Sequence, residues 1–290
     1  MIEIWTCDRK PTLIGNIHAD ANSFPDAVSK ISIKLKDSQP PVFLLKSEGE
    51  PVLVLKLIRP KSKEDEIIQY IYSILPNYVP KVFFMHETPH GKIMAQRAIK
   101  PVVLSSGKTV ITLRDFLSPA VFSLVTKSEM QCLLKQIITF LYQMQQSDPE
   151  FTHNDLKCDN ILLTEADTDF QVIIIDFETV TLTEVKTEFD TDAKTMADFG
   201  LGLEYSPYTD LHLVFLEIWN KLNATKKQSW AYEFIMFTSD IFPLPFMQTY
   251  TEKGKFVTKC NRLNSLGRKY LKETNTLSLF DALEHPFLNK

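Results

Sequence analysis

A polar run that leads into a predicted hairpin constrains this chain more than any other feature. The run His153–Asn160 reads HNDLKCDN. It is followed by the apolar residues Ile161–Leu163, a polar turn over Thr164–Asp169, and the β-branched run Val172–Ile175. Short β-type runs on either side of a polar turn are typical of a β-hairpin. The sequence therefore predicts a loop, a strand, a turn and a second strand in this order.

The hairpin would bring two polar residues close together. Asn160 immediately precedes the first strand and Asp176 immediately follows the second, so the two lie at neighbouring strand ends. Amide and carboxylate oxygens are donors of the kind that Mg²⁺ prefers. Asp155 adds a carboxylate that can orient a hydroxyl group or accept its proton. Because transfer of a γ-phosphoryl group depends on positioning and on neutralising charge, these residues predict a phosphoryl-transfer site that uses ATP and Mg²⁺.

The same residues resemble a known family. The run HNDLKCDN and the later sequence Ile175-Asp176-Phe177-Glu178 are similar to the HRD-x-x-x-x-N and DFG motifs of eukaryotic Ser/Thr protein kinases. The resemblance implies that Asp155 is the catalytic base and that Lys157 reaches the transferring phosphate. It also implies that Asn160 and Asp176 bind the metal and the nucleotide. The compact chain looks similar to the divergent kinases that large DNA viruses encode.

The first hundred residues contain short β-type runs and one helix pattern. The runs are Ile31–Leu35, Val42–Leu45, Val52–Ile58, Lys81–Phe84 and Lys92–Ala95. A stripe of isoleucines predicts a helix over residues 63–75. The kinase resemblance implies an α+β, two-lobed fold. A small antiparallel N-lobe with one helix would span residues 1–98, including an N-terminal extension to about residue 30, and a larger, mainly helical C-lobe would span residues 99–290.

The resemblance also assigns the remaining nucleotide contacts. Lys56, in the strand sequence Val54-Leu55-Lys56, takes the place of the lysine that neutralises the ATP phosphates. Its helix partner is expected to be Glu66, with Glu64 as the second choice. Adenine is expected at a hinge around 96–98, which makes Gln96 and Ala98 binding residues, while Met94 controls the depth of the pocket.

Three departures from the kinase pattern bear on activity. The turn at residues 36–41 reads KDSQPP and contains no glycine, although the family places a Gly-rich phosphate loop there. Its two prolines also remove backbone N–H donors. Glu178 replaces the glycine after Asp-Phe, which is expected to stiffen that segment. Asn154 replaces the arginine of the catalytic loop, which makes control by loop phosphorylation less favourable.

The second half of the chain predicts helices. Ser128–Gln131 has the form of a capping box and would open a helix that buries its apolar face. Further helices are expected over residues 211–222, 230–237 and 279–288, and the last of these resembles the closing helix of kinase domains. Asp210 resembles the buried aspartate that holds the kinase catalytic loop through its backbone.

Three functions remain open on the sequence. Lys157 and the closing helix favour a protein substrate with a serine or threonine acceptor. Choline and aminoglycoside kinases also carry H-x-D-L-x-x-x-N followed by I-D-F-E, and they too lack the early Gly-rich turn. A pseudokinase that binds partners through its fold is the third alternative, supported by the altered phosphate turn and opposed by the retained acidic residues.

Composition limits the setting in which such a protein works. The 290 residues are 44% hydrophobic, and the net charge of −4 is spread over interspersed acidic and basic residues, which argues against direct nucleic-acid binding. The four cysteines lack the spacing of a disulfide framework or a zinc site. No segment offers the ~18 apolar residues of a membrane span. We expect an intracellular protein, cytoplasmic or nuclear, and in the host cell if it is viral; the sequence leaves its oligomeric state open.

Overall fold

The structure is a computed structural model of the 290-residue chain. It describes residues 2–6, 13–17, 42–88, 91–167, 169–183, 206, 208–225, 228–242, 256–258, 262–274 and 277–289. The chain divides into two compact units, Met1–Lys100 and Pro101–Lys290.

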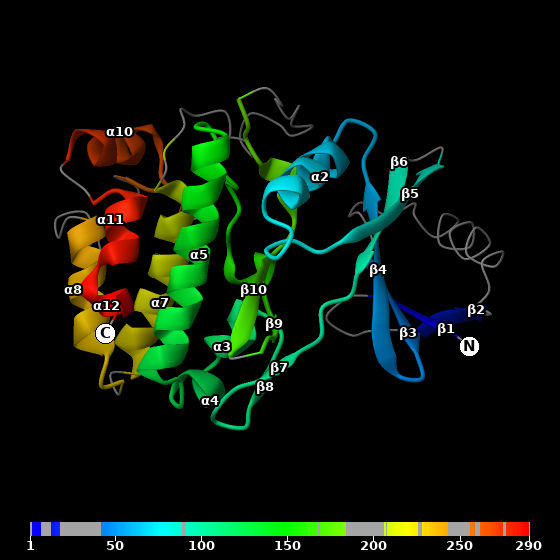
Figure 1. Ribbon diagram of the computed structural model, residues 1–290, viewed down its shortest axis with the longest axis horizontal. Helices are drawn as coiled ribbons and strands as arrows, with labels where there is room; N and C mark the ends of the chain where they lie inside the picture. The colour runs from blue at the N-terminus through cyan, green and yellow to red at the C-terminus, as the bar shows by residue number, and fades with distance from the viewer. Residues whose placement is uncertain are drawn as a thin grey trace. The chain divides into compact units, whose positions relative to one another are not determined.

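In the part of the first unit that the structure describes, a six-stranded antiparallel sheet is accompanied by one helix, α2 (Figure 1). Its elements are β1 (Ile2–Thr6), β2 (Leu13–Ile17), β3 (Val42–Ser47), β4 (Glu50–Ile58), α2 (Glu64–Ile74), β5 (Val82–Thr88) and β6 (Gly91–Arg97). The strand order is β2-β1-β3-β4-β6-β5. The helix expected over residues 63–75 is confirmed, and so are the four runs that correspond to β3, β4, β5 and β6.

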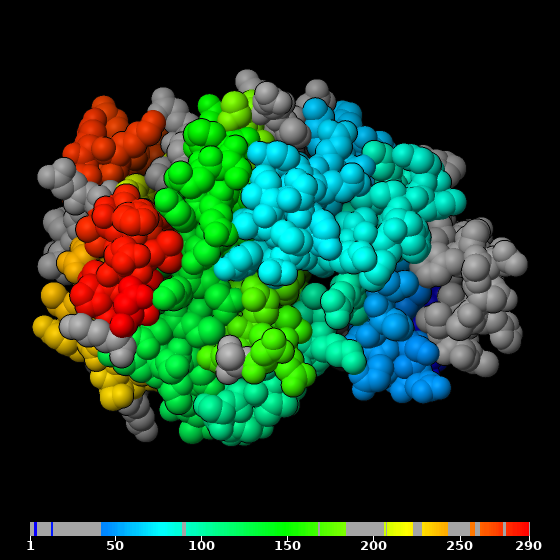
Figure 2. Space-filling view, in the orientation of Figure 1, coloured from blue at the N-terminus to red at the C-terminus, as the bar shows by residue number. Residues whose placement is uncertain are grey.

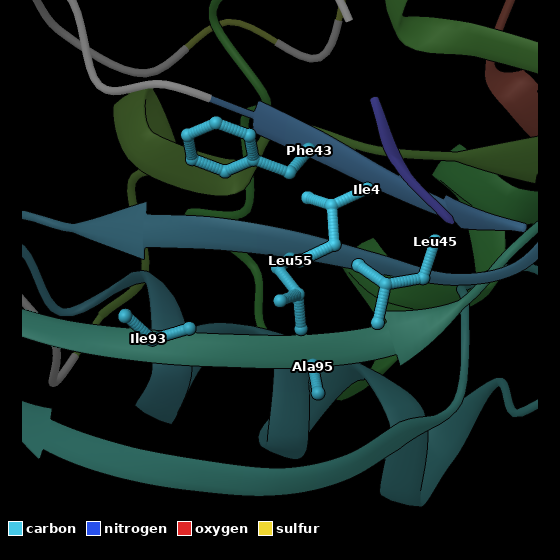
Figure 3. Close-up of a cluster of buried hydrophobic side chains, with 6 residues drawn as sticks. All are labelled: Ile4, Phe43, Leu45, Leu55, Ile93 and Ala95. Atoms are coloured by element: carbon cyan, nitrogen blue, oxygen red, sulfur yellow. The ribbon is translucent and has the colours of Figure 1, made fainter. Parts of the chain in front are cut away.

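Side chains from four strands form the core of this sheet. Figure 3 shows Ile4, Phe43, Leu45, Leu55, Ile93 and Ala95 gathered from β1, β3, β4 and β6. Phe43 and Leu45 are two residues apart and both buried, as the alternation of a strand with one covered face requires. In α2 the buried residues Ile67, Ile68 and Ile71 form one stripe, which is the helical period read from the sequence.

The N-terminal residues differ from expectation because they belong to the sheet. β1 pairs with β3 from Ile2 opposite Ser47 to Thr6 opposite Phe43, and β2 pairs with the other edge of β1. Residues 2–6 and 13–17, which fall in the expected N-terminal extension, therefore lie in the sheet. Two strands of five residues each carry too short a pattern for periodicity to reveal. The expected strand Ile31–Leu35 and the glycine-free turn at 36–41 lie outside the described residues.

The second unit is mainly helical. Its helices are α3 (Leu113–Phe116), α4 (Pro119–Phe122), α5 (Lys127–Ser147), α7 (Thr209–Thr225), α8 (Ala231–Ile241), α10 (Ser265–Glu273), α11 (Leu279–Glu284) and α12 (Pro286–Asn289), with 3-10 turns η1 (Cys158–Asn160) and η2 (Phe177–Thr179). Its strands are β7 (Val102–Val103), β8 (Thr109–Val110), β9 (Ile161–Glu165) and β10 (Phe170–Ile174). The predicted hairpin is confirmed as β9 and β10. A small antiparallel sheet with one helix and a mainly helical unit make up the expected α+β fold class.

Helix α5 is the long scaffold of this unit. Its N-cap is Thr126, whose side chain accepts from the backbone N–H of Glu129 while the Glu129 carboxylate accepts in return. The capping box expected at Ser128–Gln131 therefore begins two residues earlier. Helices α11 and α12 pack against α5, and Figure 2 shows their red surface lying along the green surface of that helix. None of the described helices has both the length and the apolar character needed to cross a membrane.

Candidate active site

Residues 152–160 form a loop between α5 and β9, and a buried carboxylate holds this loop by its backbone. Asp210, near the start of α7, accepts the N–H of His153 at 2.7 Å and the N–H of Asn154 at 2.9 Å. Burial raises the pKa of Asp210, while His153 and the two N–H donors act in the opposite direction. The structural role expected for Asp210 is confirmed.

Asn154 connects this loop to the segment that follows β10. Its backbone adopts the left-handed conformation, with φ of 64°, which asparagine tolerates better than most residues. Its side-chain nitrogen donates to the carbonyl of Thr179 at 2.8 Å and to the hydroxyl of Thr181 at 2.9 Å. Thr152 and Thr181 also form an antiparallel bridge. The side-chain amide of Asn154 therefore links the loop of residues 152–160 to the segment that follows β10.

Asp155 lies at the centre of the loop with its two carboxylate oxygens engaged on different sides. Oδ2 accepts from Lys157 Nζ at 2.7 Å and from Asn160 Nδ2 at 3.3 Å. Oδ1 accepts from a guanidinium nitrogen of Arg262. Arg262 also donates through Nε to the carbonyl of Asn154 at 2.8 Å. Hydrogen bonds from two cationic side chains and one side-chain amide thus set the orientation of the Asp155 carboxylate.

The structure brings Asn160 and the segment of Asp176 together, as the hairpin predicts. The carbonyl of Asn160 accepts the N–H of Ile175 at 3.0 Å, so Asp176 is the next residue along. Asn160 Nδ2 donates to the carbonyl of Asp155 at 2.8 Å. Since the amide nitrogen is used in this way, the amide oxygen is the atom of Asn160 that a cation would bind.

The donor chemistry at this place fits a nucleotide-borne Mg²⁺. Asp176, directly after β10, takes a left-handed backbone with φ of 66°. Its carboxylate and the amide oxygen of Asn160 are both hard donors of the kind that Mg²⁺ prefers. Across the described ranges there is no cluster of three or more histidine, cysteine, aspartate or glutamate side chains suited to a metal. Mg²⁺ commonly takes one or two carboxylates and completes its shell with phosphates and water, so a donor pair of this kind matches its needs.

The residues after Asp176 form the single turn η2. Phe177 is fully buried and its ring packs against His153, with ring centroids 5.2 Å apart. The His153 ring nitrogen Nε2 hydrogen-bonds to the carbonyl of Ile175 at 3.1 Å. Positive φ among the described non-glycine residues occurs at Glu48, Asn154 and Asp176. Glu178 is outside this set, so its backbone conformation does not require the glycine that the kinase pattern has there.

In the first unit, Lys56 forms an ion pair with a different glutamate from the one expected. Lys56 Nζ lies 2.7 Å from Glu64 Oε1. Glu64 is 2% exposed, whereas Glu66 lies on the exposed side of α2. The choice of Glu66 as partner is therefore wrong, and the second choice, Glu64, is the one that the structure shows. The helical period explains this: Glu64 precedes Ile67 and Ile68 by three and four residues and so shares their buried stripe.

Met94, Gln96 and Ala98 lie on or just after β6. Met94 is fully buried and stands directly opposite Lys56 in the β4–β6 ladder, so the two side chains share one face of the sheet. Gln96 pairs with strands on both sides. The N–H of Arg97 donates to Lys81 and the N–H of Ala98 donates to Val52. Adenine binding at residues 96–98 stays a prediction. The backbone N–H groups of Arg97 and Ala98 already donate to carbonyl groups of the same unit.

Two buried arginines escaped the sequence analysis. Arg262 contacts Asp155 from 107 residues away, and Arg268, in α10, contributes an opposite charge near Asp210. Burial lowers the pKa of Arg268, and Asp210 acts against that shift. The sequence around Arg262 has neither periodicity nor a motif, so it offered no signal.

Comparison with known proteins gives one kind of match. No family model matches the sequence, and no curated protein matches it. Among solved structures the chain is similar to the kinase PK-1 of Cydia pomonella granulovirus, with 14% identity, a TM-score of 0.49, and coverage of 91% of this chain and 99% of that chain.

Proposed function

We propose that this protein transfers the γ-phosphoryl group of ATP to a serine or threonine hydroxyl of a protein substrate inside the cell. The observation that carries the proposal is the environment of Asp155. Its backbone carbonyl and one carboxylate oxygen accept from Asn160, and the loop that carries it is held by Asp210. A carboxylate held this firmly beside two oxygen donors for Mg²⁺ is suited to orient an attacking hydroxyl.

Each residue then has a defined task. Asp155 accepts the hydrogen bond of the acceptor hydroxyl. Lys157, whose side chain is 43% exposed, has the reach to follow a phosphate. Asn160 and Asp176 would hold Mg²⁺, which when bound neutralises charge on the phosphates. Lys56, fixed by Glu64, would pair with the nucleotide phosphates as a cation of the first unit.

Lys157 supports a protein acceptor over a small molecule. It lies two residues after Asp155 and donates to it at 2.7 Å, the place where the sequence resemblance puts the lysine of Ser/Thr protein kinases. A small alcohol such as choline remains an outcome that the test must separate. So does a pseudokinase scaffold that binds partners through its fold without turnover.

The deciding experiment measures phosphate transfer from labelled ATP with Mg²⁺ to a panel that contains a casein-like protein, choline and an aminoglycoside. The wild type is compared with Asp155→Asn and with the control Asp159→Asn. Asp159 is a neighbouring aspartate that forms an exposed ion pair with Arg114, its side chain being 44% exposed. Removal of an acid or base group of this kind typically lowers turnover by about 10²–10⁴-fold.

We expect labelled phosphoserine or phosphothreonine with the wild type and Asp159→Asn, and almost none with Asp155→Asn. Label on choline or the aminoglycoside alone would replace the protein substrate by a small one. No labelled product with any acceptor, together with no Mg·ATP-induced thermal shift, would leave only the scaffold. Equal turnover by Asp155→Asn and the wild type would refute the role given to Asp155.

A further inference from the structure

Arg262 lies 107 residues after Asp155 in the sequence and contacts it in the candidate site. Its guanidinium donates through Nε to the carbonyl of Asn154 at 2.8 Å and through Nη2 to Asp155 Oδ1. It therefore bridges the backbone of one residue and the carboxylate of the next. A planar guanidinium suits this task because its donors have a fixed geometry.

The local backbone fixes the place of Arg262. Residues 257 and 263 form an antiparallel bridge. The N–H of Thr258 donates to the carbonyl of Arg262 at 2.7 Å, and the N–H of Arg262 donates to the Thr258 hydroxyl at 3.3 Å. Helix α10 begins directly afterwards, with Asn264 as an N-cap that accepts from the N–H of Gly267. Arg262 is thus held by Thr258 and is followed directly by a capped helix.

The two cations on Asp155 differ in their freedom to move. The side chain of Arg262 is 5% exposed and that of Lys157 is 43% exposed. Arg262 has a second hydrogen bond to the loop backbone, at Asn154. Displacing Arg262 would leave a buried charge uncompensated, which is costly, while a half-exposed lysine can return to water at little cost. Displacement from Asp155 therefore costs less for Lys157 than for Arg262.

We propose that Arg262 is a positioning residue for phosphoryl transfer, which holds Asp155 by Oδ1 so that Oδ2 faces the acceptor hydroxyl once Lys157 turns away. This inference rests on the proposed function. In the step itself the hydroxyl oxygen forms a bond to the γ-phosphorus, and the bond from that phosphorus to the ADP oxygen breaks. The hydroxyl proton passes to Asp155 Oδ2, and ADP leaves with the electron pair. Arg262 acts through the carboxylate and takes no part in this bond exchange.

The assignment also accounts for the altered catalytic loop. Asn154 stands where the kinase pattern has an arginine, and its side chain is used to bind Thr179 and Thr181. A guanidinium is nevertheless present at the loop, supplied by Arg262. In this chain the cation beside Asp155 thus comes from the segment before α10.

The test compares Arg262→Met, Arg262→Lys and Arg262→Ala with the wild type and with the control Arg114→Met. Arg114 also binds an aspartate, Asp159, at 2.6 Å, but its side chain is 67% exposed. Turnover number, KM for ATP and thermal unfolding are measured for each full-length variant. Arg262→Met is expected to lower kcat by about 10–100-fold, with KM for ATP changed by less than about twofold, since only the orientation of the base is lost.

Two further readouts separate positioning from folding. Arg262→Lys is expected to recover only part of kcat, because an ammonium group lacks the planar fork. Added methylguanidinium is expected to raise kcat of Arg262→Ala and to leave Arg114→Met unchanged. If Arg262→Met proves unfolded, the lysine variant and the rescue carry the decision. Lack of rescue, or loss in proportion to unfolded protein, overturns the inference.

The inference and the proposed function fail in different ways. No transfer by the wild type to any acceptor removes the proposed function, and the role of Arg262 with it. Transfer by the wild type with unchanged kcat in Arg262→Met removes the role of Arg262 alone. A raised KM for ATP at unchanged kcat would show that Arg262 serves nucleotide binding, which also overturns the proposal.

Discussion

Glu64 Oε1 accepts a hydrogen bond from Lys56 Nζ at 2.7 Å and ties the first turn of α2 to strand β4. The side chains are 3% and 13% exposed, so the pair is shielded from most solvent. Asp65, the next residue, binds Lys92 of β6 at 2.6 Å. Two consecutive acids of the helix thus hold lysines from two adjacent strands.

The first prediction concerns this pair. Glu64→Gln should raise KM for ATP by about tenfold, equivalent to ~1.4 kcal/mol, because Lys56 loses the charge that fixes it toward the phosphates. Glu66→Gln is the matched control, since it removes the same group from the exposed side of the same turn. Steady-state kinetics with varied ATP measure both. A larger effect at Glu66 than at Glu64 would contradict the pairing.

The second prediction concerns the loop anchor. Asp210→Asn keeps one oxygen and loses the second, so one N–H of His153 or Asn154 loses its acceptor. The free energy of unfolding should fall by about 1–3 kcal/mol, and turnover should fall with it as the loop loosens. Chemical denaturation and kinetics give the two quantities. Asp240→Asn, at an aspartate that binds His285 on the surface, should leave both near wild type; a similar loss there would argue against a specific role for Asp210.

The third prediction is a pH dependence at the start of α5. Burial acts to raise the pKa of Glu129, but hydrogen bonds from Thr126 and Ser105 outweigh it and lower the pKa below its usual value. A carboxyl group with a lowered pKa in the folded state stabilises the protein above its unfolded pKa, and this stabilisation disappears as pH falls through the folded pKa. Glu129→Gln should therefore cost about 1–3 kcal/mol near neutral pH.

This cost should shrink in acid, beginning near about pH 4.3, where the unfolded glutamate takes up a proton, and continuing as pH falls through the lower pKa of the folded state. Denaturation of the wild type and Glu129→Gln across the pH range gives the difference at each pH. Glu165→Gln, at an exposed strand end, should show no such trend. A Glu129 difference that grows as pH falls would contradict the prediction.

The fourth prediction concerns a thiol inside the catalytic loop. Burial raises the pKa of Cys158 to about 12, so the reactive thiolate is scarce at ordinary pH. In the folded protein at about pH 8, iodoacetamide should leave Cys158 unmodified, and urea should expose it. Peptide mapping by mass spectrometry separates this cysteine from the other three. Rapid labelling of Cys158 in the folded state would show that the loop opens.

Local patterns were sufficient for the elements and for half of the site. The hairpin of β9 and β10 follows from two short apolar runs, and its geometry alone brings Asn160 close to Asp176. The helices α2 and α5 follow from their apolar stripes. The resemblance, with the apolar pattern that follows Glu66, favoured Glu66 as the partner of Lys56. The helical period instead places Glu64 on the face of the buried isoleucines, three and four positions before them, and the structure shows this pairing.

The remaining features depend on distant contacts that no local pattern encodes. Thr126 and Ser128 are both suitable N-caps, each with an acid or amide three residues on. The choice is decided by Glu129, which also binds Ser105 from another segment. Arg262 contacts Asp155 across 107 residues of sequence, and no pattern near Arg262 indicates this contact. β1 and β2 are recognisable as strands only once their neighbours in the sheet are known.

The left-handed backbone at Asn154 and Asp176 limits how such a chain can drift during evolution. Glycine, asparagine and aspartate adopt this conformation at low cost, and branched side chains do so at high cost. Selection would act against valine or isoleucine at position 154 because of the backbone strain alone, apart from the loss of the amide hydrogen bonds. In distant descendants of this gene, the residue types at positions 154 and 176 should therefore be limited first by the backbone conformation and only then by the contacts of the side chain.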